Sequence, residues 1–163
     1  MWSPGGVPLP FCQRCTGFYA GAAVALVLHL ALRIRPGNRF LLVHGSFLLL
    51  MIPLGYHWVP QGALIRALSG VLFGAGVVSF LWLFPGPLAG ADREPGRTES
   101  LAYASGIIGA LVLIPLLAAW GGAGAWYALV CLATLGLAGL VALAAANAGV
   151  GLQWLRSRRS GAA

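Results

Sequence analysis

Five long apolar segments, separated by short polar connections, dominate the hydropathy pattern of this chain. A helix needs roughly 20 apolar residues to cross the hydrocarbon core of a bilayer, and each segment is of this order. The segments are residues 15–32, 40–59, 63–84, 101–120 and 126–150. Five such helices in succession leave no polar faces to meet water, as the helices of a soluble protein must. The pattern predicts an all-α, polytopic transmembrane helix bundle of about five spans.

The composition agrees with a membrane environment. Of the 163 residues, 60% are hydrophobic and 8% are charged, whereas a soluble domain carries roughly a quarter charged residues. Tryptophans fall at predicted helix ends, where amphipathic rings favour the headgroup layer; they are Trp58, Trp82, Trp120, Trp126 and Trp154. We therefore expect one membrane domain over residues 1–163, with the lipid bilayer as its partner.

The basic residues predict how the chain is oriented. All ten are arginines and the formal net charge is +7, but they lie at helix ends rather than in one patch that would bind nucleic acid. Arg14 and Arg66 fall on one side of the predicted bundle, and the other side carries Arg33, Arg35, Arg39, Arg93, Arg97, Arg156, Arg158 and Arg159. By the positive-inside rule the side with eight arginines is cytoplasmic.

This orientation predicts the place of each connection in a bacterial cytoplasmic membrane. The N-terminus faces outward, while the loop 85–100 and the basic tail 151–163, with the C-terminus, are cytoplasmic. Residues 1–11 lack the basic start of a cleavable signal peptide, so we expect the first apolar segment to be a retained helix. Two G-x-x-x-G patterns, at 17–21 and 70–74, are interpreted as helix-packing faces.

A Cys-Gln-Arg-Cys motif directly precedes the first span. Thr16 can cap that helix, and a helix N-terminus together with Arg14 would stabilise a thiolate on Cys12 or Cys15. Three interpretations stay open: a structural disulfide or pair of thiols, half of a zinc site, or thiol–disulfide exchange that can be coupled to a membrane quinone.

Other residues are expected at the same outer depth as the motif. Tyr56, His57 and Arg66 flank the turn between the second and third spans, and Cys131 lies near the outer end of the last span. With Tyr19 they form a predicted outer pocket. Cys131 can be a resolving thiol, a further ligand or a small buried hydrophobe, and His57 is a candidate zinc ligand beside Cys12 and Cys15.

Polar residues elsewhere in the spans are few. His29 and His44 fall toward the cytoplasmic ends of consecutive helices, so they can approach each other, and a histidine pair can bind metal or relay protons. Asn147 is expected to make a helix-packing hydrogen bond. The sequence contains no P-loop and no paired intramembrane carboxylates, which removes kinase and carboxylate-driven proton-pump functions.

The stretch Gly6–Gly21 resembles the motif of a family of small bacterial multi-pass membrane proteins of unknown function, P-x-C-x-R-C-T-G-x-Y-x-G. The stretch Leu64–Gly74 is similar to that family's R-x-x-[ST]-G-x-x-x-G. The resemblance implies that the motif positions are Cys12, Arg14, Cys15, Thr16, Gly17, Tyr19, Gly21, Arg66 and Gly70. It implies no biochemical activity. Family members usually carry a further Cys-His pair upstream of this motif, whereas here Met1 stands only eleven residues before Cys12. Either the start lies further upstream, or this member lacks two potential ligands, and the metal interpretation is the one that this difference weakens most.

Two functional hypotheses follow. In one, the chain is an integral membrane protein that is redox-active through an outward-facing Cys12–Cys15 pair, assisted by Arg14. In the alternative, it is a non-enzymatic metal-binding or small-solute transport or assembly component with a structural motif. Quinone and zinc are the cofactors that these hypotheses would involve, and the sequence identifies no protein partner or oligomeric state.

Overall fold

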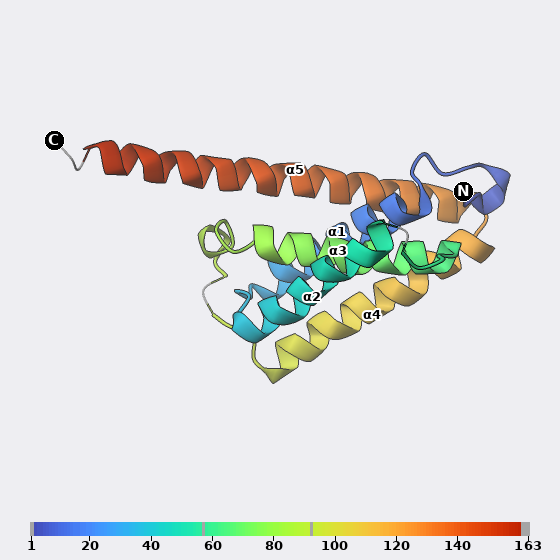
Figure 1. Cartoon of the computed structure of the whole chain (residues 1–163), viewed down its shortest axis with the longest axis horizontal. Helices are drawn as coiled ribbons and strands as arrows, with labels where there is room; N and C mark the ends of the chain where they lie inside the picture. The colour runs from blue at the N-terminus through green and yellow to red at the C-terminus, as the bar shows by residue number, and fades with distance from the viewer. Residues whose placement is uncertain (1, 57, 92, 161–163) are drawn as a thin grey trace.

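The computed structural model describes residues 2–56, 58–91 and 93–160. Five α-helices, each long and apolar enough to cross a membrane, form a bundle (Figure 1), which confirms the predicted all-α transmembrane architecture. The helices are α1 (Gln13–Leu32), α2 (Asn38–Gly55), α3 (Ala63–Leu81), α4 (Arg97–Trp120) and α5 (Ala123–Ser160). Two short 3₁₀ turns, η1 (Pro4–Gly6) and η2 (Pro87–Ala89), lie in the connections.

The helix ends differ from the predicted boundaries where local backbone chemistry overrides hydropathy. α3 ends at Leu81, three residues before the predicted end, because Pro85 and Pro87 cannot continue a helix. α4 begins at Arg97, four residues before the apolar segment, with Gly96 as its N-cap and Glu99 in its first turn. Glutamate in the first turn stabilises a helix N-terminus, so the polar end of the predicted loop is helical.

The last helix is much longer than its apolar segment. No proline interrupts the chain after Asn147, and the segment expected as a basic tail continues as helix to Ser160. With 38 residues, α5 is about 57 Å long, against roughly 30 Å for the hydrocarbon core. Figure 1 shows its C-terminal part projecting beyond the other helices.

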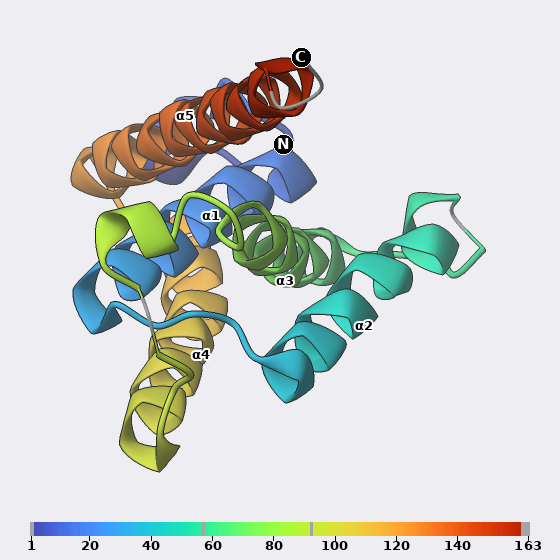
Figure 2. The same cartoon turned by 90° about the vertical axis from the view of Figure 1, so that its left-hand side faces the viewer.

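α1 lies at the centre of the bundle, between α3, α4 and α5 (Figure 2). Its closest neighbour is α3, and both predicted G-x-x-x-G faces lie in this contact. A Cβ atom on Gly17 would meet the backbone of Ala67, and one on Gly70 would meet the backbone carbonyl of Arg14. Glycine at these positions lets the two helix backbones touch, which confirms the interpretation of both patterns as packing faces.

The N-terminal segment lies across the turn between α4 and α5. The backbone N–H of Gly5 donates to the carbonyl of Gly121 at 3.1 Å, and the indole N–H of Trp126 donates to the carbonyl of Pro8 at 3.2 Å. The side chain of Leu9, in the same segment, is buried against α4 and α5. These contacts hold the chain that leads into the Cys-Gln-Arg-Cys motif at one end of the bundle.

At the opposite end, the connections 33–37 and 82–96 are tied together. Ile34 and Arg93 form an isolated bridge, and the indole N–H of Trp82 donates to the Ile34 carbonyl at 3.1 Å. Trp82 was expected in the headgroup layer, but it is 4% exposed because its ring closes the core over this connection. Trp58, Trp120 and Trp154 are exposed, as the interfacial interpretation requires.

Candidate functional site: a thiol pair at the first turn of α1

The motif forms the beginning of α1. Cys12, with extended backbone, is the N-cap, and its Sγ accepts a hydrogen bond from the backbone N–H of Cys15 at 3.2 Å. The expected cap, Thr16, is instead buried inside the first turn, where its hydroxyl donates to the carbonyl of Phe11 at 3.4 Å. The prediction of Thr16 as the cap is therefore wrong, because the cysteine sulfur occupies the position that a capping oxygen usually takes.

The two thiols of the motif are in contact. Cys12 and Cys15 are unoxidised, and their sulfur atoms share a hydrogen bond at 2.8 Å. A disulfide has a sulfur–sulfur distance of about 2.05 Å, so the pair can close with an approach of less than about 1 Å. Cys12 is exposed and Cys15 is half-buried, so a molecule that approaches the protein surface meets Cys12 first.

The surroundings of Cys12 favour its thiolate. Partial burial works to raise the pKa of the Cys12 thiol, but hydrogen bonds from the side chain and backbone of Cys15 and from the backbone of Arg14, and more weakly the charge of Arg14, outweigh it. The pKa of Cys12 therefore lies below its ordinary value. A larger fraction of Cys12 is thiolate, the nucleophilic form, near neutral pH.

The guanidinium of Arg14 points away from the thiols. Its Nη2 donates to the carbonyl of Leu54 in the last turn of α2 at 3.0 Å and to the side-chain oxygen of Gln61 in the connection that follows. Its Nε is buried and has no hydrogen-bond partner among the described residues. The Arg14 side chain thus links the motif to α2 and to the α2–α3 connection. Arg14 acts on the Cys12 thiol through its backbone N–H and, more weakly, through its charge.

Gln61 is the residue that joins the two arginines of this end. Its side-chain N–H₂ donates to Leu54, its side-chain oxygen accepts from Arg14, and its backbone carbonyl accepts from Arg66 at 3.0 Å and 3.3 Å. Sequence reasoning did not identify Gln61, because a glutamine in a Pro-Gln-Gly turn is typical of a solvated loop. Its position at the depth of Arg14 was the one signal available.

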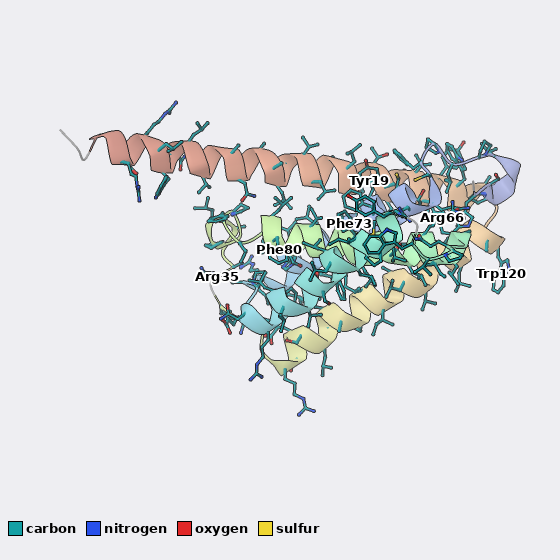
Figure 3. All side chains as sticks on the ribbon, in the orientation of Figure 1. Tyr19, Arg35, Arg66, Phe73, Phe80 and Trp120 are labelled. Atoms are coloured by element: carbon teal, nitrogen blue, oxygen red, sulfur yellow. The ribbon has the colours of Figure 1, made fainter. Side chains whose placement is uncertain are left out.

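The remaining residues of the predicted outer pocket are more scattered. Tyr19 packs its ring against Phe11 with centroids 5.4 Å apart, directly below the motif. Tyr56 is 74% exposed and stacks on Trp58, and Cys131 is exposed on α5. Figure 3 shows Arg66 toward the end of the bundle opposite to Arg35.

A metal site is not complete among the residues that the structure describes. They contain no group of three or more histidine, cysteine or acidic side chains close enough to hold an ion. Cys12 and Cys15 supply two of the four ligands that a structural zinc site normally has. His57, the predicted third ligand, lies outside the described residues.

A second polar cluster lies inside the bundle near its other end. His29 is fully buried, and its Nε2 lies 3.2 Å from the hydroxyl of Ser79. His44 Nε2 lies 3.2 Å from the hydroxyl of Tyr103, which lies 3.4 Å from that of Ser79. The two histidines approach each other as expected, but Phe40, Ser79 and Tyr103 connect them. Ser79 and Tyr103 were missed because hydroxyl side chains scattered through apolar spans carry no spacing that marks them as partners.

Asn147 makes the helix-packing hydrogen bond that was expected of it. Its side-chain N–H₂ donates to the carbonyl of Leu81 on α3 at 2.8 Å and to that of Leu143 on its own helix at 2.7 Å. The bond ties the end of α3 to α5. Asn147 is therefore a structural residue of the bundle, as the sequence indicated.

The five apolar helices define a multi-pass integral membrane protein. Residues 3–80 match the family model described as "Predicted membrane protein (DUF2085)", a stretch that includes the thiol motif, α1, α2 and nearly all of α3. The match covers somewhat less than half of the chain, and the activity of that family is not known. No curated protein shows a significant match to the chain. No solved structure does so either.

Proposed function

We propose that this chain is a membrane-bound thiol–disulfide exchange protein whose reactive groups are Cys12 and Cys15. The observation that carries the proposal is the pair of contacting free thiols, of which the exposed one has a lowered pKa. A nucleophilic outer thiol beside a less exposed second thiol is the arrangement that exchange requires. The reaction needs neither zinc nor quinone.

The exchange has two steps, with a disulfide of another protein or small molecule as the oxidant. The Cys12 thiolate attacks one sulfur of that disulfide, a mixed disulfide forms, and the other sulfur leaves as a thiolate that takes up a proton. Cys15 then loses its proton and attacks Cys12 Sγ, which releases the second substrate thiol. The motif becomes a disulfide as the substrate disulfide is reduced to two thiols. The reverse steps oxidise a substrate dithiol.

The arginine distribution supports an extracytoplasmic location for the exchange. Eight of the ten arginines belong to the side of the bundle away from the motif, and positive charge marks the cytoplasmic side of a membrane protein. The thiols of a bacterial cytoplasmic membrane protein oriented in this way meet an oxidising compartment. A Cys12–Cys15 disulfide does not react with maleimide, so intact cells are first treated with a reductant. A membrane-impermeant maleimide would then label Cys12, whereas labelling only after lysis would contradict this orientation.

Thiol trapping in membranes tests the exchange itself. In a Cys131→Ser background, a Cys15→Ser variant leaves the mixed disulfide on Cys12 unresolved, so we expect adducts on a non-reducing gel that disappear on reduction. Cys12→Ser is the matched control and forms none. If the pair stays reduced under oxidising conditions and Cys15→Ser forms no adduct, the exchange function is wrong.

The capping bond of Cys12 favours a second candidate, in which the motif is only structural. Serine is a good N-cap and alanine is not, so Cys12→Ser keeps the cap while Cys12→Ala loses about 1 kcal/mol of stability. A structural motif predicts that Cys12→Ser preserves the cellular phenotype at matched expression, and exchange predicts that both variants abolish it. Stoichiometric zinc in purified protein, absent from the Cys12→Ser and Cys15→Ser variants, would instead support a metal-binding component.

A further inference from the structure

The end of the bundle opposite to the thiols contains a cleft between α2 and α4. α2 packs against α3, and α4 packs against α1 and α3, but the two helices do not pack closely against each other; their N-terminal ends are separated in Figure 2. Two adjoining cavities of about 630 Å³ and 270 Å³ occupy the space between them. Both are lined by Phe40, Val43 and Ser100, so they form one continuous cleft.

The larger cavity is the charged part of this cleft. It is lined by Arg39, Arg97 and Glu94. Arg39 is the second residue of α2, and Arg97 is the first residue of α4. The one ion pair among the described side chains joins Arg93 to Glu99, so none of these described carboxylates forms an ion pair with Arg39 or Arg97. Both helices begin at glycine N-caps without a side-chain capping bond, which adds the positive ends of two helix dipoles.

The smaller cavity is the apolar part. Its walls include Phe47, Ile108 and Leu111, and Ile108 is 60% exposed on the surface of α4. The bonded pair His44 and Tyr103 is the main polar feature of its lining. In a membrane such an apolar cleft opens toward lipid, since the exposed surface of these spans is itself apolar.

We propose that the cleft binds an anionic phospholipid, with its phosphate at Arg39 and Arg97 and an acyl chain along the apolar walls. Charge complementarity selects this occupant: cationic side chains stand at the helix ends, where headgroups lie, and the apolar part continues into the depth of the bilayer. A neutral apolar ligand would leave the arginines unused. The proposal does not depend on the thiol motif or on its function.

Glu94 has a defined effect on this site. Its carboxylate lies against Gly37 at the start of α2, where it competes with a bound phosphate for the same positive charge. Removing that charge by Glu94→Gln should therefore tighten lipid binding. Removing Arg39 or Arg97 should weaken it, so charge changes of opposite sign have opposite outcomes within one cleft.

Native mass spectrometry of the purified full chain in detergent, titrated with phosphatidylglycerol or phosphatidylcholine, tests the headgroup. We expect preference for phosphatidylglycerol, and binding about fivefold to tenfold weaker for each of Arg39→Gln and Arg97→Gln. Arg158→Gln is the matched control, because Arg158 stacks on Trp154 far along α5. Equal binding of the two lipids, or equal losses in all three arginine variants, would overturn the proposal.

A second pair of variants tests the apolar part. Ala104 lines the smaller cavity and Ala102 does not, and both are exposed on α4. Ala104→Trp should fill the cleft and reduce phosphatidylglycerol binding, whereas Ala102→Trp should leave it unchanged. Inorganic phosphate should not displace the lipid at millimolar concentration. If it does, and Ala104→Trp binds like the unmodified chain, the cleft is a site for a free anion and the lipid proposal is wrong.

Discussion

Replacing Gly74 by alanine tests how closely α1 and α3 must approach each other. The added methyl group would meet the backbone of α1, with the Phe18 carbonyl closest and the Ala22 nitrogen at 2.8 Å. Ordinary contact begins at about 3.4 Å, and backbone atoms cannot move aside as a flexible side chain can. The two helices must therefore separate, and overpacking of this kind costs about 1–3 kcal/mol.

The intrinsic preference of helices for alanine works in the opposite direction. Alanine is about 1 kcal/mol more favourable than glycine in a helix interior, so the net loss for Gly74→Ala should be about 0–2 kcal/mol. Gly109 on α4 is the matched control, because a Cβ atom there would meet nothing within 4 Å. Gly109→Ala should gain the propensity term alone, so the two variants should differ by about 1–3 kcal/mol.

Reversible unfolding in mixed micelles of dodecylmaltoside and dodecyl sulfate, followed by circular dichroism, measures this difference. The comparison of two glycine-to-alanine changes cancels most of the effect that each has on the unfolded chain. If Gly74→Ala is as stable as Gly109→Ala, then α1 and α3 do not need backbone contact, and the reasoning from the glycine faces fails.

Three further predictions concern other contacts. Gln61→Ala should destabilise the folded chain by about 1–3 kcal/mol in the same unfolding assay, because the half-buried guanidinium of Arg14 loses one of its two hydrogen-bond acceptors and keeps only the Leu54 carbonyl. An unchanged stability would mean that water replaces the lost bond. Alkylation of Cys12 should persist to lower pH than that of an ordinary thiol, since a lowered pKa keeps the thiolate populated as pH falls. Cys15→Ser should raise the pH at which the alkylation rate of Cys12 is half-maximal. Identical pH profiles of the two proteins would refute the role of Cys15. Trp82→Phe should cost about 1 kcal/mol and speed proteolysis of the connection between α1 and α2, and equal cleavage rates would count against it.

The helices could be predicted from the sequence because lipid imposes a simple rule on them. Each span must satisfy its backbone internally over about 20 residues, so hydropathy alone locates α1 to α5. The continuation of α5 to Ser160 could not be read from hydropathy, since it depends on the absence of a helix breaker among polar residues. The position of Trp82 depends on its hydrogen bond to Ile34, a contact between residues 48 positions apart.

The sequence predicted which residues form the candidate site better than it predicted their hydrogen-bond partners. The thiol pair follows from a spacing of three at a helix start, which is local. The direction of Arg14 depends on where Leu54 and Gln61 come to lie, and no local pattern contains that information. The cluster around Tyr103 likewise requires four helices to be placed before its members meet.

The glycine contact between α1 and α3 also constrains the order in which the bundle can assemble. Glycine has no side-chain rotamers to lose, so this pairing is favourable in lipid, where no hydrophobic force drives helices together. It joins the first and third spans, so it has to wait until α3 has entered the membrane. α2 spends that interval unpaired. In the finished bundle only 11% of the residues in its most apolar stretch are buried, against 50% for α3. The span inserted between the two partners is thus the one best suited to remain in contact with lipid.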